Sequence, residues 1–320
     1  MKDAPKLPAF DVRIPPPDLT CWRAGNTGTE GVWRFAAAAP GPHLVMVSLI
    51  HGNEYAGAIV IADLLRAGFR PSRGCVTFVF ANLAAFDRFD PDMPTASRFV
   101  DEDMNRVWDV HLLEGGRRTV EAERARALLP VILAADAVLD LHTMLWQDEP
   151  MLLAGASRKG CAFARALGAT ELIVTDHGHA SGPRLIDAAP FVDEADPRVA
   201  VLLEAGRHWE ASAVETARGV VTCALRHLGL AGADHPALPE PPPAVTPRVA
   251  QVTHAITAAT DAFAFVDAWQ GVASVPRRNT LIALDGEAEI RTPYDDCLLV
   301  MPSLRPTRGH TAVRLARLTT

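Results

Sequence analysis

Short apolar runs alternate with longer amphipathic segments over residues 43–230, and this alternation limits the chain to a few architectures. Each run has the length of one strand, while the segments between runs have helical periodicity. Strands that are apolar throughout are typical of a sheet covered on both faces. The pattern predicts an α/β fold with a mostly parallel or mixed central sheet and helices on both faces. The expected strands are Leu44–Ile50, Val76–Ala81, Ala137–Leu141, Met151–Ala154, Leu172–Thr175 and Val199–Leu203.

Four helical segments lie between these runs, and several of them open at Ser or Thr, which cap helix N-termini. The expected helices are Tyr55–Ala67, Thr119–Ala134, Ser157–Leu167 and Ser212–Leu228.

The composition changes after the last of these helices. Residues 231–248 are rich in proline and alanine and lack periodicity, which favours an extended connector. Short apolar runs then follow, separated by turn signals such as Asp285-Gly286. We expect a larger domain over residues 1–230, a Pro-rich linker over 231–248 and a small β-rich domain over 249–320. Strands in the last part are expected at Thr280–Leu284, Ala288–Thr292 and Cys297–Met301.

The charge of the chain argues against a nucleic-acid partner. The formal net charge is −7 and no long run of Lys or Arg occurs, so the positive surface that binds phosphates is missing. The N-terminus lacks the apolar segment of a secretory signal, and no uncharged apolar run is long enough to cross a membrane. Five scattered cysteines do not suit a disulfide framework. We expect a soluble cytoplasmic protein without nucleic-acid or membrane partners.

Potential metal ligands follow two of the expected strands. His51 comes directly after the strand expected at Leu44–Ile50, and Glu54 lies three residues later, before a helix. His142 follows the strand expected at Ala137–Leu141, and the carboxyl ends of parallel strands face one crevice. Two histidines and a glutamate are an established ligand set of catalytic zinc, which keeps one position for water. A single such residue is more often structural, so the spacing alone leaves both interpretations open.

Four short motifs occur in order along the chain. They are H-G-N-E-Y-A-G at residues 51–57, R-F-V-D-E-D-M-N-R at 98–106, D-L-H at 140–142 and L-E-A-G at 203–206. In order and spacing they resemble the succinylglutamate desuccinylase/aspartoacylase family, which is related to zinc carboxypeptidases. The resemblance covers roughly residues 40–305. It implies a carboxypeptidase-like catalytic domain, a smaller β-domain, and hydrolysis of the amide between an acyl group and an amino acid.

The resemblance also implies roles for individual residues. His51, Glu54 and His142 are similar to the family's ligands of a single zinc ion. Glu204 is similar to the carboxylate that transfers protons during hydrolysis, and Arg98 resembles the arginine that polarises the scissile carbonyl.

Within the second motif, Asn105 and Arg106 resemble the pair that binds a substrate carboxylate. The implied substrate is therefore a small anionic N-acyl amino acid. Met104 stands where Leu is common in the family, which is a tolerable apolar exchange. The arginine that family members place upstream of the catalytic glutamate has two candidates here, Arg184 and Arg198.

Other residues near the motifs have candidate supporting roles. Asp140 lies two residues before the second histidine ligand, on the same strand face, where it can orient that ligand. His177 and His179 lack a third ligand, which favours a loop or substrate contact over a second metal site. His208 is a candidate for tuning substrate choice, and Tyr294 for lining the cleft entrance.

These inferences predict a zinc-dependent amidohydrolase that releases an amino acid, or a close analogue, from its N-acyl derivative. A metallocarboxypeptidase acting on short peptides would use the same metal and is the nearest alternative. A non-catalytic zinc-binding relative is a third hypothesis, but Glu204 and Arg98 argue against it because such a protein needs no proton carrier. The acyl group, the pathway, homo-oligomer formation and the metal used in the cell are left open.

Overall fold

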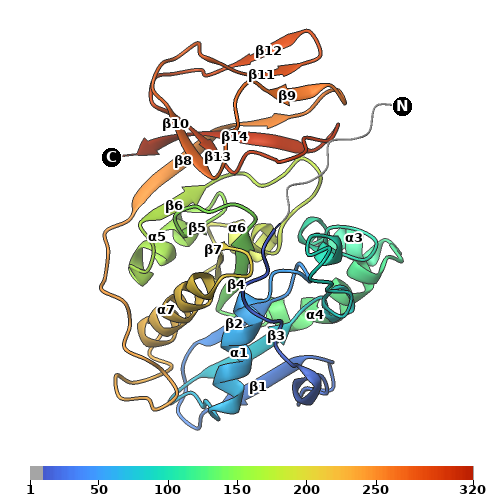
Figure 1. The fold of residues 1–320 in the computed structure, drawn as a ribbon. Helices are drawn as coiled ribbons and strands as arrows, with labels where there is room; N and C mark the ends of the chain where they lie inside the picture. The colour runs from blue at the N-terminus through green and yellow to red at the C-terminus, as the bar shows by residue number, and fades with distance from the viewer. Residues whose placement is uncertain (1–9, 320) are drawn as a thin grey trace.

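The structure, a computed structural model, describes residues 10–319, and its largest feature is one mixed β-sheet (Figure 1). Eleven strands form this sheet in the order β1-β3-β2-β4-β7-β5-β6-β8-β14-β13-β10. The predicted α/β fold with a mixed central sheet is therefore confirmed. The strands are β1 (Val32–Ala36), β2 (His43–Ser48), β3 (Cys75–Phe80), β4 (Ala137–Met144), β5 (Met151–Leu153), β6 (Leu172–Thr175), β7 (Val199–Arg207), β8 (Arg248–Thr257), β10 (Val272–Val275), β13 (Cys297–Val300) and β14 (Thr311–Thr319).

The strands at the centre of the sheet are parallel, and this arrangement positions the candidate ligands. Strand β2 pairs in parallel with β3 and β4, and β4 pairs in parallel with β7. Ser48, at the end of β2, is in register with Leu141 of β4, and His142 is in register with Glu204 of β7. The carboxyl ends of β2, β4 and β7 therefore meet at one edge of the sheet.

Alternate residues of the strands pack against opposite layers of helices. In β2, Leu44 and Met46 belong to one hydrophobic core, and Val45 and Val47 belong to the other. This alternation is the reason that the strands are apolar throughout. The first core is covered by α1 (Ala56–Arg66), α5 (Arg158–Leu167) and α7 (Ala211–His227), and the second by α4 (Val120–Leu133).

The four helices expected from the sequence are thus present. Two begin at hydroxyl caps: Thr119 Oγ1 accepts a hydrogen bond from Ala122 N, and Ser157 Oγ accepts one from Gly160 N, both at 3.1 Å. Pro130 lies inside α4, which continues to Leu133. The remaining short helices are η1 (Thr20–Trp22), α2 (Leu83–Phe86), η2 (Ala96–Arg98), η3 (Met104–Arg106), α3 (Val110–Glu114), η4 (Leu185–Asp187) and α6 (Ala189–Val192).

The C-terminal part is rich in strands, as expected. Strands β9 (Phe263–Phe265), β11 (Leu281–Asp285) and β12 (Ala288–Arg291) form a separate antiparallel sheet. Gly286 makes the turn between β11 and β12 with φ of 63°, a conformation that favours glycine. Strands β8, β14, β13 and β10 extend the large sheet instead, because β8 pairs with β6.

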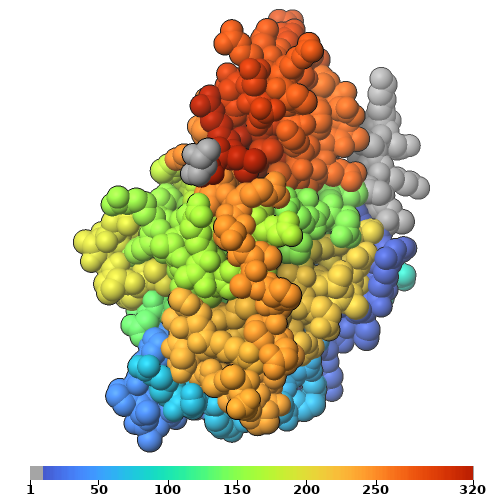
Figure 2. All heavy atoms as spheres, turned by 90° about the vertical axis from the view of Figure 1, so that its left-hand side faces the viewer, coloured from blue at the N-terminus to red at the C-terminus, as the bar shows by residue number. Residues whose placement is uncertain are grey.

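The segment before β8 connects the two parts of the molecule. Residues 231–247 form neither helix nor strand. In Figure 2 this orange segment runs over the surface of the α/β part toward the C-terminal strands. The division into residues 1–230, 231–248 and 249–320 stays a prediction. Within residues 10–319, no helix combines the length and apolar character that a membrane span requires.

Candidate metal centre and active site

Close backbone packing fixes the loop that carries the first two candidate ligands. The loop joins β2 to α1. A Cβ atom on Gly52 would lie 2.4 Å from backbone atoms of Ala85 and Phe86, and one on Gly57 would lie 2.5 Å from Cβ of Leu141. Only glycine permits these approaches to α2 and β4. The glycines of the first motif thereby hold His51 and Glu54 beside β4.

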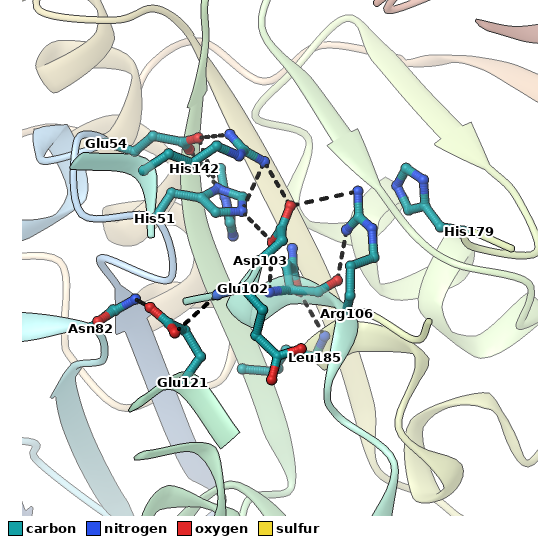
Figure 3. Close-up of polar contacts among 12 residues, drawn as sticks. His51, Glu54, Asn82, Glu102, Asp103, Arg106, Glu121, His142, His179 and Leu185 are labelled. Atoms are coloured by element: carbon teal, nitrogen blue, oxygen red, sulfur yellow. Dashed lines mark hydrogen bonds and ion pairs between the residues drawn. The ribbon is translucent and has the colours of Figure 1, made fainter. Parts of the chain in front are cut away.

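His51, Glu54 and His142 come together in a buried cluster (Figure 3). One ligand atom from each residue lies within 4.8 Å of those from the other two. Glu54 Oε1 is 2.8 Å from His51 Nδ1, and Glu54 Oε2 is 3.0 Å from His142 Nδ1. The Nδ1 atoms of both imidazoles therefore face the same carboxylate.

The other nitrogen of each imidazole faces an aspartate. His51 Nε2 lies 2.9 Å from Asp103 Oδ1, and His142 Nε2 lies 2.9 Å from Asp140 Oδ2. Carboxylates in this position orient histidine ligands and make them more basic. The contact places Asp140 beside His142 without a hydrogen bond between them, so the orienting role of Asp140 stays a prediction. Asp103 plays the equivalent part for His51.

The donor set suits a cation. His51 Nε2 lies 2.9 Å from Asp103 Oδ1 and 2.8 Å from Arg98 Nη2, and in the tautomer that donates its Nε2 proton to Asp103 the Nδ1 presents a lone pair. That Nδ1 is buried without a hydrogen bond and points at a carboxylate oxygen, which a bound cation would satisfy. Burial opposes the charge on His142, but Asp140 and Glu54 raise its pKa well above the usual value, so a proton is strongly attracted here. A metal ion would replace that proton. These residues can hold a metal ion.

Glu204 lies on β7 beside the cluster and is buried. Its Oε2 has no hydrogen-bond partner among the described residues. Burial, together with the negative charge of Glu54, raises the pKa of Glu204 to about 8. A carboxyl group with this pKa can both accept and release a proton near neutral pH.

Arg98, at the end of η2, approaches the cluster from another side. Its Nη1 donates to Glu54 Oε1 at 3.0 Å, and its Nη2 donates to Asp103 Oδ2 at 3.3 Å. Arg98, His51, Glu54 and Glu204 all line one cavity of about 190 Å³. The structure thus brings the candidate catalytic pair and two of the candidate ligands to a shared space.

A buried glutamate fixes the loop that carries Arg98. Glu121 of α4 accepts hydrogen bonds from the backbone N–H groups of residues 100, 101 and 102, at 2.7, 3.0 and 3.2 Å. It also accepts one from the side chain of Asn82, at 3.0 Å (Figure 3). Because Glu121 has no exposed surface, breaking this network would leave buried donors unpaired.

Asn105 and Arg106 occupy different environments. Asn105 Oδ1 accepts from Leu185 N at 2.9 Å, so this side chain anchors η4. Arg106 lines a second cavity of about 850 Å³, and Arg98 lines both this cavity and the first. The pKa of Arg106 is lowered to about 10, chiefly by burial; three neighbouring arginines act in the same direction and Asp103 acts against them. An anionic ligand would relieve this excess of positive charge.

The two candidates for the additional arginine differ in position. Arg184 is buried, and its guanidinium pairs with Asp187, at 2.8 Å from Nε to Oδ2, and with Asp176. Arg198 pairs with Asp196 and donates to the carbonyl oxygen of Leu133 at 2.7 Å. Neither arginine lines the two cavities described above.

Arg314 of β14 is an arginine near the site that the sequence did not indicate. Its Nε lies 2.9 Å from Asp176 Oδ2, and its side chain is 8% exposed. It also contacts His179, whose pKa is lowered by burial and by the charge of Arg314. No motif surrounds Arg314, so only the pairing of β14 with the rest of the sheet reveals it.

His208 and Tyr294 have separate surroundings. His208 lines the first cavity and pairs through Nδ1 with Thr143 Oγ1 at 2.6 Å. Burial lowers the pKa of His208 to about 4, so its imidazole is neutral at pH 7. Tyr294 packs in the C-terminal core and bonds Thr253 Oγ1 at 2.6 Å, so it lines neither cavity.

Known proteins share both the sequence pattern and the fold. The family model of the succinylglutamate desuccinylase/aspartoacylase catalytic domain matches residues 40–208, more than half of the chain. No curated protein matches the chain in sequence. Solved structures similar in fold include a succinylglutamate desuccinylase from Vibrio parahaemolyticus, at 15% identity and a TM-score of 0.67, covering 91% of this chain and 87% of that one.

Two further structures extend this similarity. A succinylglutamate desuccinylase/aspartoacylase from Rhodobacter sphaeroides is 20% identical, with a TM-score of 0.62 and coverage of 90% of this chain and 89% of that one. The ectoine utilization protein EutE (DoeB) from Ruegeria pomeroyi is 19% identical, with a TM-score of 0.56 and coverage of 90% and 88%. These identities show a common fold, and the family model goes further. The chain belongs to the succinylglutamate desuccinylase/aspartoacylase family.

Proposed function

We propose that the protein is a zinc-dependent amidohydrolase that cleaves an N-acyl amino acid, or a close analogue, into a carboxylate and a free amine. Its family is one of amide-hydrolysing deacylases. The observation that carries the proposal is a buried His-Glu-His cluster, two members of which, His51 and Glu54, line one cavity together with Glu204 and Arg98.

One zinc ion per chain would be held by His51, Glu54 and His142, which supply the nitrogen and oxygen donors that zinc prefers. Bound zinc supplies Lewis acidity, which polarises a carbonyl and lowers the pKa of a water from 15.7 to roughly 7. Asp103 and Asp140 hold the two imidazoles in the orientation that binding requires.

Glu204 transfers the protons. Amide hydrolysis forms a bond from water oxygen to the carbonyl carbon and breaks the carbon–nitrogen bond. Glu204 accepts a proton from the attacking water and delivers it to the departing nitrogen. Its unpaired Oε2 and raised pKa suit both steps.

Arg98 stabilises the negative charge that develops on the carbonyl oxygen. Glu54 and Asp103 hold its guanidinium in place before the substrate arrives, so little reorganisation is needed during the reaction. Arg106 binds the substrate carboxylate in the second cavity, where a planar guanidinium can form two parallel hydrogen bonds. Asn105 completes this subsite by anchoring the surrounding backbone.

The proposed partner is therefore a small anionic N-acyl amino acid. We place the enzyme in the cytoplasm, with neither a nucleic acid nor a membrane as partner, in agreement with its charge and cysteine content.

A substrate panel tests the proposal. Zinc-loaded protein is incubated with N-acyl amino acids and with dipeptides, and free amine is measured before chelation, after chelation and after zinc is restored. The proposal expects zinc-dependent release of amine from N-acyl amino acids. Preferential release of C-terminal residues from dipeptides would identify a carboxypeptidase. Zinc binding without turnover of either class would identify a non-catalytic relative.

A further inference from the structure

The cavity beside the metal cluster has two unlike walls. One wall carries His51, Glu54, Arg98 and Glu204. The other wall consists largely of apolar side chains from two places in the fold, the end of β4 and the segment that follows β13. The apolar members are Met144, Leu145, Trp146, Met301, Pro302 and Leu304.

This cavity offers no uncommitted cation. Arg98 is the one arginine or lysine among its lining residues, and it is paired with Glu54 and Asp103. The polar groups beyond the catalytic wall, Thr143 and His208, bond to each other at 2.6 Å. A ligand carboxylate placed here would lose its hydration, gain no cation and approach Glu204.

The second cavity is different in character. It is lined by several charged side chains of both signs and by hydroxyl groups, and its volume of about 850 Å³ exceeds the 190 Å³ of the first. The arginines are Arg98, Arg106, Arg117 and Arg305, the carboxylates are Asp101, Glu102 and Asp103, and the imidazoles of His179 and His310 also line the cavity.

The difference in polarity between the two cavities determines which end of the substrate lies in which cavity. Arg98 lines both cavities, and the scissile carbonyl lies beside it in the proposed function. With the substrate carboxylate on Arg106, the amino acid occupies the second cavity. The acyl group then extends into the first cavity, against the apolar wall.

We infer, resting on this proposed function, that the enzyme removes short, uncharged, apolar acyl groups and discriminates against acyl groups that end in a carboxylate. The cavity of about 190 Å³ also holds the reacting carbonyl and water, which limits the acyl chain to a few carbons. Met144, Met301 and Leu304 set this limit.

A matched pair of acyl groups provides the test. Butyryl and succinyl have similar lengths, but succinyl ends in a carboxylate where butyryl ends in a methyl. Each is attached to the same set of amino acids, and kcat/KM is measured with zinc-loaded protein. We expect butyryl to exceed succinyl by at least about 100-fold on every amino acid that is cleaved. Equal or greater values for succinyl would overturn the inference and leave the amidohydrolase function intact.

A charge introduced into the wall should reverse part of this preference. Leu304→Arg supplies a cation for the succinyl carboxylate, so the succinyl-to-butyryl ratio of kcat/KM should rise at least about tenfold. Leu284→Arg is the matched control, because Leu304 and Leu284 are 37% and 38% exposed and Leu284 lies on β11, outside both cavities. A ratio that does not respond to Leu304→Arg would contradict the position assigned to the acyl group.

Binding separates the inference from the proposed function. Calorimetry with the Glu204→Gln variant measures the affinity for both members of the pair without hydrolysis. Tighter binding of the butyryl compound, together with absence of turnover by the wild-type protein, would refute the hydrolase and retain the apolar subsite. Absence of binding by both members would refute both.

Discussion

Replacing Glu204 by glutamine should abolish most activity and at the same time stabilise the metal-free protein. The side chains have the same shape, so the exchange removes a titratable group from a buried position beside Glu54. Loss of a general acid–base group typically lowers kcat by about 10²–10⁴-fold. The effect on stability follows from the pKa of the same carboxyl group.

The stabilisation depends on pH because the pKa of Glu204 differs between the unfolded and the folded protein. Unfolded, Glu204 ionises near pH 4.5, whereas in the folded protein it stays protonated to about pH 8. Unfolding therefore releases a proton between these values, and the folded state loses stability as the pH rises through them. At pH 7 the loss amounts to about 3 kcal/mol, at about 1.36 kcal/mol per pH unit. Glutamine does not titrate, so the variant avoids this loss.

Urea unfolding of the chelated proteins at pH 5 and pH 8 measures the difference. The variant should gain little stability at pH 5 and several kcal/mol at pH 8. Bound zinc places a positive charge beside Glu204 and lowers its pKa, so the gain should shrink in the metal-loaded protein. Glu215→Gln, at a side chain that is 73% exposed on α7, is the control and should change neither activity nor stability. A gain that is independent of pH would refute the assignment of the raised pKa to Glu204.

Four further substitutions test other parts of the site. Arg98→Met should lower kcat by about 10²–10³-fold with a smaller change in KM, because the guanidinium stabilises the negative charge that develops on the carbonyl oxygen during the reaction. A change in KM alone, measured by steady-state kinetics, would contradict this role. Asp103→Asn should weaken zinc binding by about 10–100-fold, measured by competition with a chromophoric chelator, since a ligand histidine loses its carboxylate; unchanged affinity would remove Asp103 from the metal centre. Asp176→Asn should lower the free energy of unfolding by about 3–5 kcal/mol, because it leaves Arg314 buried without its closest carboxylate. Arg314→Met should lower the free energy of unfolding by less, since Asp176 keeps its ion pair with Arg184. A larger loss for Arg314→Met than for Asp176→Asn in urea unfolding would show that Asp176 and Arg314 do not act as an ion pair.

The sequence was informative where a local pattern determines position. Runs that are apolar throughout predict the central strands, and the rule that parallel strands end at one edge predicts that His51 and His142 lie together. Their meeting depends only on the pairing of β2 with β4. Glu54 follows because three residues separate it from His51 on a loop that glycine packing holds close to β4.

Pairings between distant segments could not be read in the same way. Periodicity identifies a strand but not the strand that pairs with it. The sequence therefore does not predict that β8 pairs with β6, and it does not predict that Arg314 lies beside Asp176. Arg184 is one of two candidates for the arginine that family members place upstream of the catalytic glutamate. Its two carboxylate partners, Asp176 and Asp187, lie close in sequence, but only the folded loop shows that both face its guanidinium.

The origin of the cavity walls bears on how the proposed acyl selectivity could change. Glu204, Glu54 and Arg98 belong to strand ends and loops that the central sheet and Glu121 hold rigidly. Half of the apolar wall comes instead from the segment after β13, which carries Met301 and Leu304 and contributes no ligand to the metal cluster. Exchanges in that segment alter the surface that the acyl group meets and leave the proton carrier and the ligands in place. In this proposal the end of β4 carries both the candidate ligand His142 and half of the apolar wall, whereas the segment after β13 carries only the other half. Substitutions after β13 are therefore the ones expected to change acyl selectivity without moving a ligand.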